Sequence, residues 1–397
     1  MTPSFAISAE TARDLDRYRK MAGMVGAAAL LLCAIGGLFS PEQFFRSYLT
    51  AYVFVIGIAL GSLAIIMLHH LTGGAWGLVI RRLLESVTRT LPLMAVLFLP
   101  LAFGVRYLYI WARPEVMARD AILQHKEAYL NVPFFLARAV LYFAVWLAVA
   151  YFLNRWSLEQ DQRGPEPMAR KMQLLSGPGL LLYGATVTFA SVDWVMSLDP
   201  HWFSTIYGVL FMGGQALSAM AFVIAATVLL ARTSPLAEVI RPDHLQDLGK
   251  LMLTFVMLWA YFAFSQLLII WSGNLPEEIP WYIRRLTGGW EYVGLALILF
   301  HFFLPFALLL SRKAKRNYSF IASIAGWVIF MRFVDVFWMV VPEFAGHRFL
   351  VSWMDPLALA GIGGVWLAFF LWQLDRRPLL PLRDAHLTEA LEHGRAH

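Results

Sequence analysis

The chain has 397 residues, of which 59% are hydrophobic and only 15% are charged, and its formal net charge is +6. Soluble domains have roughly 45–50% apolar and about 25% charged residues, so this chain lacks the polar residues that would cover a soluble surface. Its 30 Phe, 15 Trp and 14 Tyr residues exclude a disordered chain. The single cysteine, Cys33, excludes a disulfide framework and an iron–sulfur cluster held by this chain alone. The composition therefore predicts a polytopic membrane protein.

Ten apolar runs are each long enough to cross a bilayer, whose hydrocarbon core of about 30 Å takes roughly 20 helical residues. We therefore predict an all-α polytopic membrane protein with about ten transmembrane helices. The transmembrane domain covers residues 22–374, with terminal segments at 1–21 and 375–397. Residues 8–21 are expected to form a short interfacial helix. The predicted spans are, in chain order, residues 22–39, 49–70, 90–111, 133–153, 174–197, 203–231, 250–272, 290–310, 318–341 and 353–374.

The distribution of Lys and Arg predicts the orientation, because cytoplasmic loops carry an excess of these residues. In the loops and terminal segments, 22 Lys and Arg residues lie on the side of both chain ends and 7 lie on the other side. The remaining three, Arg106, Arg138 and Arg332, lie inside predicted spans. We therefore expect both termini in the cytoplasm. The basic residues are scattered over six segments, so the net charge reflects topology and nucleic-acid binding is not expected.

The two halves of the chain contain matching segments. The third and seventh spans align at an offset of 160 residues, and the fifth and ninth align at 142, which places Asp193 on Asp335. Chance similarity between Leu-rich helices and an internal duplication both explain these matches. A duplication predicts two parallel repeats, each a four-helix bundle, because four spans return the chain to the same side. The bundles would comprise spans 2–5 (residues 49–197) and spans 6–9 (residues 203–341), with flanking helices at 22–39 and 353–374.

Ionisable residues inside membrane spans are costly to bury and are therefore candidate functional groups. Arg332 and Asp335 stand three positions apart on one helix face, where a structural ion pair and a proton-relay element explain them equally well. Asp193 has no basic residue three or four positions away, so we expect it to exchange protons, with Glu291 as its outlet. The remaining relay candidates are His301 in mid-span and His69 and His70 at a span end.

Several of these residues also have a structural interpretation. Glu291 is equally explained as an acidic residue that stabilises a helix start through the helix dipole. His301 stands between phenylalanines, where a hydrogen-bonded packing histidine is the better explanation. His69 and His70 stand where residues often anchor a helix at the level of the headgroups. Haem b ligation is disfavoured, because His301 has no evident mate at the same depth.

The half of the membrane away from the chain ends holds further polar groups. A quinol site needs a proton acceptor, a hydrogen-bond donor and an aromatic cleft. The candidates for contacting a quinol, or for balancing a buried acid, are Arg106, Arg138 and Gln266. Residues 273–289 form a loop on the same side that contains prolines and no Lys. We expect this loop to contact an extrinsic partner through residue types enriched at interface centres, namely Trp281, Tyr282, Arg284 and Arg285.

Three segments resemble the ActF family, whose members are NrfD/PsrC-like membrane subunits of bacterial alternative complex III, a quinol:cytochrome c or quinol:oxidase oxidoreductase. They are residues 69–77 (HHLTGGAWG), 191–202 (SVDWVMSLDPHW) and 271–282 (WSGNLPEEIPWY). The resemblance covers about residues 40–375 and implies two four-helix bundles with outer helices in a bacterial inner membrane. It also implies quinol or quinone as a ligand. The implied partners are a sister NrfD-like subunit, an iron–sulfur subunit, and multihaem and monohaem cytochrome c subunits, which would carry the haem and iron–sulfur clusters.

In this family quinol oxidation is usually assigned to the sister subunit. The resemblance therefore implies a scaffolding subunit that conducts protons or contributes to quinol binding, with no cofactor of its own. Two other classes stay open. A free-standing secondary transporter would show helices broken at the midplane, and only the fifth span has a strong Gly/Pro interruption, at its inner end. A lipid-modifying membrane enzyme would favour paired acids on a loop, and Glu277 and Glu278 form such a pair between two prolines.

Overall fold

The computed structural model describes residues 8–164, 167–233, 236–346, 348–384 and 387. Residues 1–7, 385–386 and 388–397 of the expected terminal segments therefore lie outside the described residues. All regular secondary structure within the described part is helical. Ten of its helices or helix groups are long and apolar enough to cross a membrane. The chain is therefore an all-α polytopic membrane protein, as its composition predicts.

Eight spans are built around one long helix each, and two are composite. The long helices are α1 (Ala9–Phe39), α2 (Pro41–Thr72), α9 (Val132–Arg163), α10 (Met168–Trp194), α11 (Tyr207–Leu230), α13 (Pro242–Gly273), α18 (Tyr318–Val340) and α20 (Met354–Leu374). The third span consists of α3 (Leu78–Thr88), α4 (Leu91–Leu97) and α5 (Leu99–Phe103). The eighth consists of α15 (Trp290–Ala296), the π-helical stretch η4 (Leu297–Phe303) and α16 (Leu304–Leu310). Helices α4, α5 and α16 each have a proline in the first turn, which lacks the N–H that a continuing helix needs.

Short helices connect the spans. After the third span come α6 (Val105–Leu108), η2 (Ile110–Ala112), α7 (Pro114–Met117) and α8 (Ala121–Lys126), and the other connecting helices are η1 (Ala75–Gly77), η3 (Met196–Leu198), α12 (Leu236–Val239), α14 (Ile279–Arg285), α17 (Arg312–Arg316) and α19 (Pro342–Ala345). Polar caps fix where two helices begin. The Asp120 carboxylate accepts two backbone N–H groups at the start of α8, and the Asn131 side chain accepts the Phe134 N–H at the start of α9.

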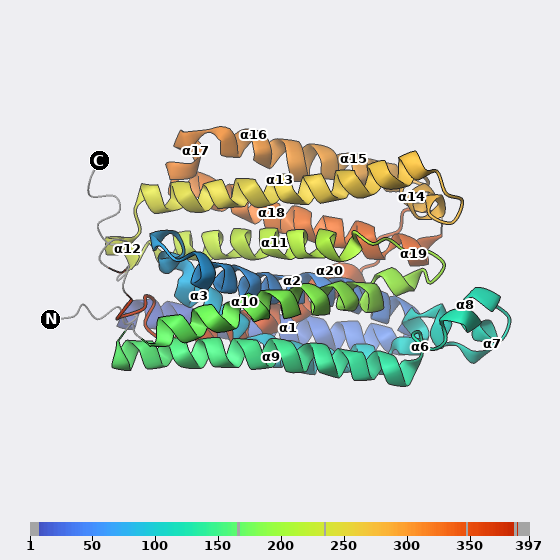
Figure 1. The fold of residues 1–397 in the computed structure, drawn as a ribbon, viewed down its shortest axis with the longest axis horizontal. Helices are drawn as coiled ribbons and strands as arrows, with labels where there is room; N and C mark the ends of the chain where they lie inside the picture. The colour runs from blue at the N-terminus through green and yellow to red at the C-terminus, as the bar shows by residue number, and fades with distance from the viewer. Residues whose placement is uncertain (1–7, 165–166, 234–235, 347, 385–386, 388–397) are drawn as a thin grey trace.

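The spans lie side by side along the longest axis of the molecule and form two four-helix bundles (Figure 1). In the first bundle α2, the third span, α9 and α10 pack together, and in the second α11, α13, the eighth span and α18 pack together. Contacts between α2 and α11 join the bundles, while α1 and α20 pair with each other and pack on α2. This grouping matches the predicted bundles of spans 2–5 and 6–9 with two flanking helices.

Helices α1 and α20 run antiparallel. Gly26 faces Gly364, and Gly36 faces Met354, so α1 begins where α20 ends. We call this end of the molecule the terminal end and the opposite end the far end. The loop that contains α6 to α8 lies at the far end (Figure 1).

The joint between the bundles depends on a glycine of α2. A Cβ atom on Gly61 would lie 2.0 Å from the carbonyl oxygen of Gln215 on α11, whereas one on Gly57 would lie 3.5 Å from the Gln215 side chain. Small residues spaced by four positions let membrane helices approach closely. Gly61 therefore allows direct backbone contact between the bundles, and Gly57 does not have that role.

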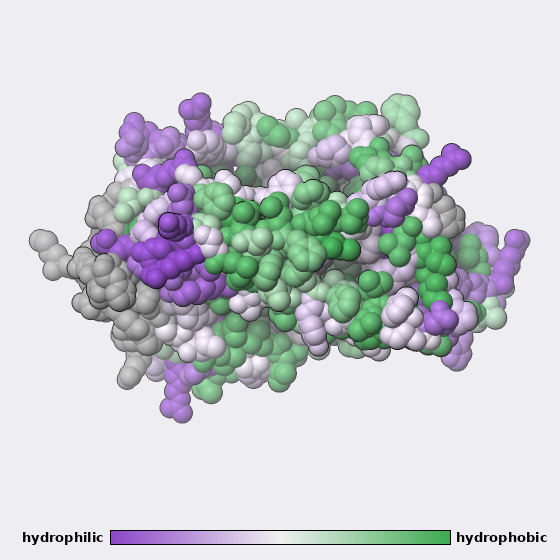
Figure 2. Space-filling model, turned by 90° about the horizontal axis from the view of Figure 1, so that it is seen from above, coloured by the Kyte–Doolittle hydropathy of each residue, from purple (hydrophilic) through white to green (hydrophobic). Residues whose placement is uncertain are grey.

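The surface fits a lipid environment. Figure 2 shows hydrophobic residues over the middle of one face, with hydrophilic residues gathered toward the ends. Large apolar side chains are strongly exposed on several spans, including Leu38 and Phe103 at 82% and Leu181 at 78%. Exposed apolar areas of this extent are unfavourable in water and favourable in a bilayer.

The predicted limits of the first and third spans differ from those in the structure. No break separates an interfacial helix from the first span, because α1 is continuous from Ala9 to Phe39. The third span begins at Leu78 and ends at Phe103, about twelve residues earlier than at its predicted start and eight earlier at its end. The basic residues near its start marked this region as a loop in the sequence. They lie inside the helix because a buried glutamate neutralises them.

Candidate functional site

Asp193, near the end of α10, is the centre of a buried polar cluster in the first bundle. The Arg138 guanidinium on α9 donates two hydrogen bonds to its carboxylate, both 2.8 Å long, and the Tyr142 hydroxyl donates a third at 2.7 Å. Arg138 also donates to the Tyr129 carbonyl at 2.9 Å, and its guanidinium carbon lies 3.8 Å from the centre of the Tyr129 ring. The carboxylate is thus held by a fork-shaped pair of charged donors, a strong kind of contact.

Asp193 has its basic partner on the neighbouring helix, and Arg138 thus balances a buried acid, which is one of the two roles expected for it. Spacing within α10 cannot reveal a residue that lies 55 positions earlier in the chain. Proton exchange by Asp193 would first require this fork to open. Its expected outlet, Glu291, belongs to the second bundle, where its carboxylate accepts the Gly289 N–H at 2.8 Å at the start of α15. Glu291 therefore takes the position of a helix-start residue, and no contact in the described part of the chain joins it to Asp193.

The second bundle contains a related cluster around Asp335 on α18. Arg332, one turn earlier, forms an ion pair with its carboxylate, and the Trp259 indole on α13 donates to it at 3.1 Å. A Cβ atom on Gly214 of α11 would lie 2.2 Å from the Arg332 guanidinium, so only glycine leaves room for it there. The expected sharing of one helix face by Arg332 and Asp335 is confirmed. Their role in a proton relay stays a prediction.

His301 lies in the π-helical stretch of the eighth span and is fully buried. Its ring packs edge-to-face on Trp259, with the ring centres 4.2 Å apart. Neither ring nitrogen has a hydrogen-bond partner among the described residues. His301 is thus a packing residue without the hydrogen bond that we expected. The structure brings it together with Asp335 through Trp259, and π-helical turns occur frequently at functional sites.

The other candidates in the spans lie apart from these clusters. Arg106 is exposed in α6, beyond the end of the third span at Phe103, so its predicted place inside that span is wrong. Gln266 on α13 is buried and lies near Ser204 and Tyr282, at 3.3 and 3.5 Å between polar atoms.

The two histidines at the end of α2 are largely inside the protein. His69 is buried, and its ring packs edge-to-face on Trp76, with the ring centres 5.3 Å apart. His70 is half-buried and lines a cavity of about 700 Å³ at the terminal end, together with Arg81 and Gln160. Neither residue projects from the surface as an exposed anchor at the headgroups would.

Trp281 and Arg285 are not the exposed contact residues that we expected. Their exposed fractions are 2% and 0%, because α14 packs on α19 and Arg285 reaches the carbonyls at the end of α18. The Arg285 guanidinium lies 3.6 Å from the centre of the Trp281 ring, pairs with Glu343 at 2.8 Å and donates to the Met339 carbonyl at 2.7 Å. Burial lowers the pKa of Arg285, while Glu343 opposes this shift.

The other two candidates in this loop remain partly accessible. Tyr282 and Arg284 are both half-buried, so they can still reach a partner. Burial raises the pKa of Tyr282 to about 12.

A row of alternating charges connects the loops at the far end. The carboxylate of Asp120 accepts a hydrogen bond from His201 at 2.6 Å, and this bond lowers the pKa of Asp120. Asp199 stands beside His201 and pairs with Arg284, which also lies 3.3 Å from Glu343. These residues come from four different loops and both bundles. The row therefore ties the two bundles together at this end, and no spacing in the sequence predicted it.

A pocket of about 400 Å³, which we call the aromatic pocket, lies at the far end beside the Asp193 cluster. It is lined by His125, Lys126, Ala128, Tyr129, Leu130, Val192, Met196, Ser197, Pro200, Trp202 and Phe203. The Lys126 ammonium donates to the Pro200 carbonyl at 2.6 Å. The Trp202 indole nitrogen is buried and has no hydrogen-bond partner in the described part of the chain. Burial and the neighbouring Asp193 carboxylate raise the pKa of Tyr129.

The aromatic pocket can hold a flat ligand with polar oxygens. Its walls are mostly aromatic or apolar, and the donors among its lining residues include the Lys126 ammonium and the Trp202 indole N–H, which is buried and unpaired within the described residues. Tyr129 connects it to the Arg138–Asp193 pair, since the same tyrosine lines the pocket and packs on the guanidinium. Lys126 and Trp202 were not predicted as site residues, although Trp202 ends a segment that carries the family resemblance.

No protein-family model and no curated protein sequence matches the chain. Within the described residues, no group of three or more His, Cys, Asp or Glu side chains could hold a metal ion. The interpretation of the site therefore depends on its geometry and on the three segments that resemble the ActF family.

Sequence reasoning also missed a charged cluster at the terminal end. Glu85 of α3 is fully buried between Arg81 at 3.0 Å and Arg82 at 2.6 Å. Arg82 also pairs with Asp161 on α9, and Arg81 pairs with Asp384 at 2.7 Å. This cluster fastens the third span to α9 and to the segment after α20. The spacing of Glu85 three and four residues after the arginines was the signal that could have revealed it.

Proposed function

We propose that the chain is an integral membrane subunit of a quinol-oxidising respiratory complex of the alternative complex III type. In this proposal it lies in a bacterial inner membrane with both termini in the cytoplasm. It scaffolds a sister NrfD-like subunit, an iron–sulfur subunit and cytochrome c subunits, and it contributes to binding the quinol headgroup. The observation that carries the proposal is the aromatic pocket beside the Asp193 cluster.

The pocket and the family resemblance point to the same residues. Residues 191–202 form one of the three segments that resemble the ActF family, and five lining residues of the aromatic pocket belong to it. These are Val192, Met196, Ser197, Pro200 and Trp202. The segment connects the last span of the first bundle to the first span of the second, so a ligand there would contact the junction of the two repeats.

The chemistry of the pocket suits a quinol headgroup. Oxidation of a quinol removes two electrons and two protons from its hydroxyl groups. In the proposed complex the electrons pass to haem and iron–sulfur groups of partner subunits, and the residues of this chain hold the headgroup. Lys126 and Trp202 supply hydrogen-bond donors to its oxygens. Burial lowers the pKa of Lys126, opposed by Asp199 and Asp120, which brings its proton exchange closer to neutral pH.

The proposed orientation places the aromatic pocket on the side of the membrane where release of protons from a quinol would conserve energy. With both termini in the cytoplasm, the far end faces the periplasm, and protons released from a quinol there would leave on that side. The row of charges from Asp120 to Glu343 lies at the same end and offers acceptors at the surface. Conduction of protons across the whole chain by Asp335 and His301 is a further part of the proposal.

The proposal is tested with the complex purified from its native membrane. Lys126→Gln should raise the KM for a short-chain quinol about tenfold, because a charged hydrogen bond contributes roughly 1.5–3 kcal/mol. Trp202→Phe keeps the stacking on Trp281 and should raise the KM by a smaller factor. Haem content should stay unchanged in both. Lys171→Gln, on an exposed position of α10 at the terminal end, is the matched control.

A KM that stays within about twofold of the unmodified complex in both pocket variants would show that the quinol binds elsewhere. Loss of the cytochrome subunits from the variant complexes would show instead that the pocket residues serve assembly.

A further inference from the structure

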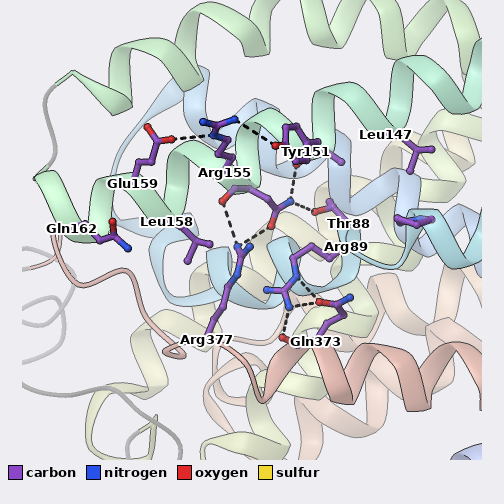
Figure 3. A pocket seen from close by; sticks show the side chains of 13 residues that line it. Thr88, Arg89, Leu147, Tyr151, Arg155, Leu158, Glu159, Gln162, Gln373 and Arg377 are labelled. Carbon is purple, nitrogen blue, oxygen red and sulfur yellow. Dashed lines mark hydrogen bonds and ion pairs between the residues drawn. The ribbon is translucent and has the colours of Figure 1, made fainter.

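A second cavity, which we call the arginine pocket, lies at the terminal end between the third span, α9 and the segment after α20 (Figure 3). Its volume is about 570 Å³, and apolar atoms make up most of its wall. The apolar lining residues are Pro92, Leu147, Ala150, Tyr151 and Leu158, and the basic ones are Arg89, Arg155 and Arg377.

Arg89 is a cation without a counter-charge. It donates to the side chain and the backbone carbonyl of Gln373, at 2.7 and 2.6 Å, and forms no ion pair with any described carboxylate. Its Nη1 atom is buried without a hydrogen-bond partner in the described part of the chain. Arg89 is half-buried, and a partly desolvated cation without a carboxylate partner favours the binding of an anion.

The pocket as a whole carries excess positive charge. Arg377 donates to the Asn154 side chain at 3.0 Å, and its nearest carboxylate, Glu85 at 3.6 Å, is already shared with two other arginines. Figure 3 shows Arg377 and Arg89 side by side on one wall, and Arg155 with Glu159 on the other. The wall thus carries three guanidinium groups and one carboxylate. Arg155 pairs with that carboxylate and Arg377 lies within reach of Glu85, so Arg89 is the cation that favours an anionic ligand.

The pocket changes from apolar to charged along its length. From Leu147 to Gln162 its wall follows α9 for 15 residues, or roughly 22 Å. Leu147 and Tyr151 come first, and Arg155 follows toward the helix end. Tyr151 is 58% exposed, so this wall faces outward, where lipid surrounds a membrane protein. An acyl chain on the apolar part and a phosphate among the arginines match this gradient.

We propose that the arginine pocket binds an anionic phospholipid. Its phosphate lies between Arg89 and Arg377, Arg155 approaches it from the mouth, and an acyl chain follows Tyr151 and Leu147. Guanidinium groups suit phosphate because two of their N–H groups can bind two of its oxygens at once. Basic pockets between transmembrane helices bind anionic headgroups in this manner. The lipid would supply the counter-charge that Arg89 lacks, and it would fasten the segment after α20 to α9.

The test is native mass spectrometry of the full chain, or of the complex that contains it, purified in mild detergent. Phosphatidylglycerol, cardiolipin, phosphatidylcholine and inorganic phosphate are added separately. We expect the two anionic lipids to bind about tenfold more tightly than phosphatidylcholine, a ratio that corresponds to about 1.4 kcal/mol. Inorganic phosphate should not displace them at equal concentration, because it lacks the acyl contacts.

Arg89→Gln should lower the affinity for phosphatidylglycerol about tenfold, since it removes a charged donor to the phosphate. Arg155→Gln changes an exposed side chain, so it tests the site even where Arg89→Gln fails to fold, and a smaller loss is expected. Leu147→Trp fills the apolar part and should also weaken binding. Lys313→Gln, exposed at the same end in the second bundle, is the matched control and should bind lipid like the unmodified chain.

Equal binding of phosphatidylcholine and phosphatidylglycerol by the unmodified chain would overturn the proposal. So would unchanged phosphatidylglycerol binding in both Arg155→Gln and Leu147→Trp. Displacement of the lipid by inorganic phosphate at equal concentration would identify a site for free phosphate and would overturn the lipid assignment.

Discussion

Asp193 and Arg138 depend on each other for burial in the first bundle. Replacing Asp193 by Asn keeps the shape but leaves the Arg138 guanidinium with no carboxylate in the cluster. Removing one partner of a buried ion pair costs about 3–5 kcal/mol of unfolding free energy. We therefore expect Asp193→Asn to lower the thermal unfolding temperature of the purified protein clearly, as followed by tryptophan fluorescence in detergent.

Two further variants make this prediction specific. Arg138→Met combined with Asp193→Leu removes both charges and should recover most of the lost stability, because neither partner is left uncompensated. Glu159→Gln breaks the exposed pair with Arg155 and should change the unfolding free energy by less than about 1 kcal/mol. An Asp193→Asn protein as stable as the unmodified one would contradict the structural role and favour proton exchange by Asp193.

Which side chains meet could be predicted only where they share a helix. The pair of Arg332 and Asp335 followed from its spacing of three residues. Arg138 was a candidate partner for a buried acid, but its pairing with Asp193 in particular did not follow, because it depends on how α9 and α10 pack. The burial of Arg285 was missed for a related reason, since residue type indicated an interface while the local fold places it against α19.

At the scale of helices, apolar runs locate the spans well and their ends less well. A predicted span ends where charged residues interrupt the apolar run. This prediction fails where the charged residues neutralise each other inside a helix. Arg81, Arg82 and Glu85 do so in α3, which begins about twelve residues before the predicted span. The same rule ended the predicted fourth span at residue 153, whereas α9 continues to Arg163. A helix that continues beyond its apolar run cannot be detected from hydrophobicity.

Close contact between α2 and α11 predicts opposite effects for two glycines of one helix. Gly61→Ala puts a Cβ atom against the Gln215 backbone, so the helices must separate, at a cost of about 1–3 kcal/mol. Gly57→Ala meets only ordinary contact distances and should be neutral or stabilising by up to about 1 kcal/mol through helix propensity. Thermal unfolding in detergent measures both. Equal effects of the two substitutions would contradict the joint described here.

For the whole molecule, the sequence predicted the ten spans and their grouping into two bundles. The grouping followed from the sequence match that aligns Asp193 with Asp335. In the structure, contacts between α2 and α11 join the two bundles. The contacts between the bundles at the far end could not be predicted. They link single charged residues from four loops, whose positions depend on the finished fold.

Orientation in the membrane is a prediction for the whole molecule. Arg81, Arg82 and Arg89 belong to the third span, and Arg106 lies beyond its far end. The 22 and 7 basic residues of the two sides therefore become 19 and 8. The excess still predicts that both termini lie in the cytoplasm. A fluorescent reporter that folds only in the cytoplasm should therefore be active when it is fused after His397. Activity of a periplasm-specific reporter at the same position would reverse the orientation.

The most direct test of the proposed function is to purify the protein with its partners. A tagged copy expressed from its own chromosomal locus is extracted in mild detergent, and the preparation is analysed by mass spectrometry, haem spectroscopy and quinol oxidation with a cytochrome c acceptor. We predict that multihaem and monohaem cytochromes c, an iron–sulfur subunit and a sister NrfD-like membrane subunit co-purify with quinol-oxidising activity. A preparation that contains this chain alone, without haem and without quinol oxidation, would contradict the proposal and favour a free-standing transporter.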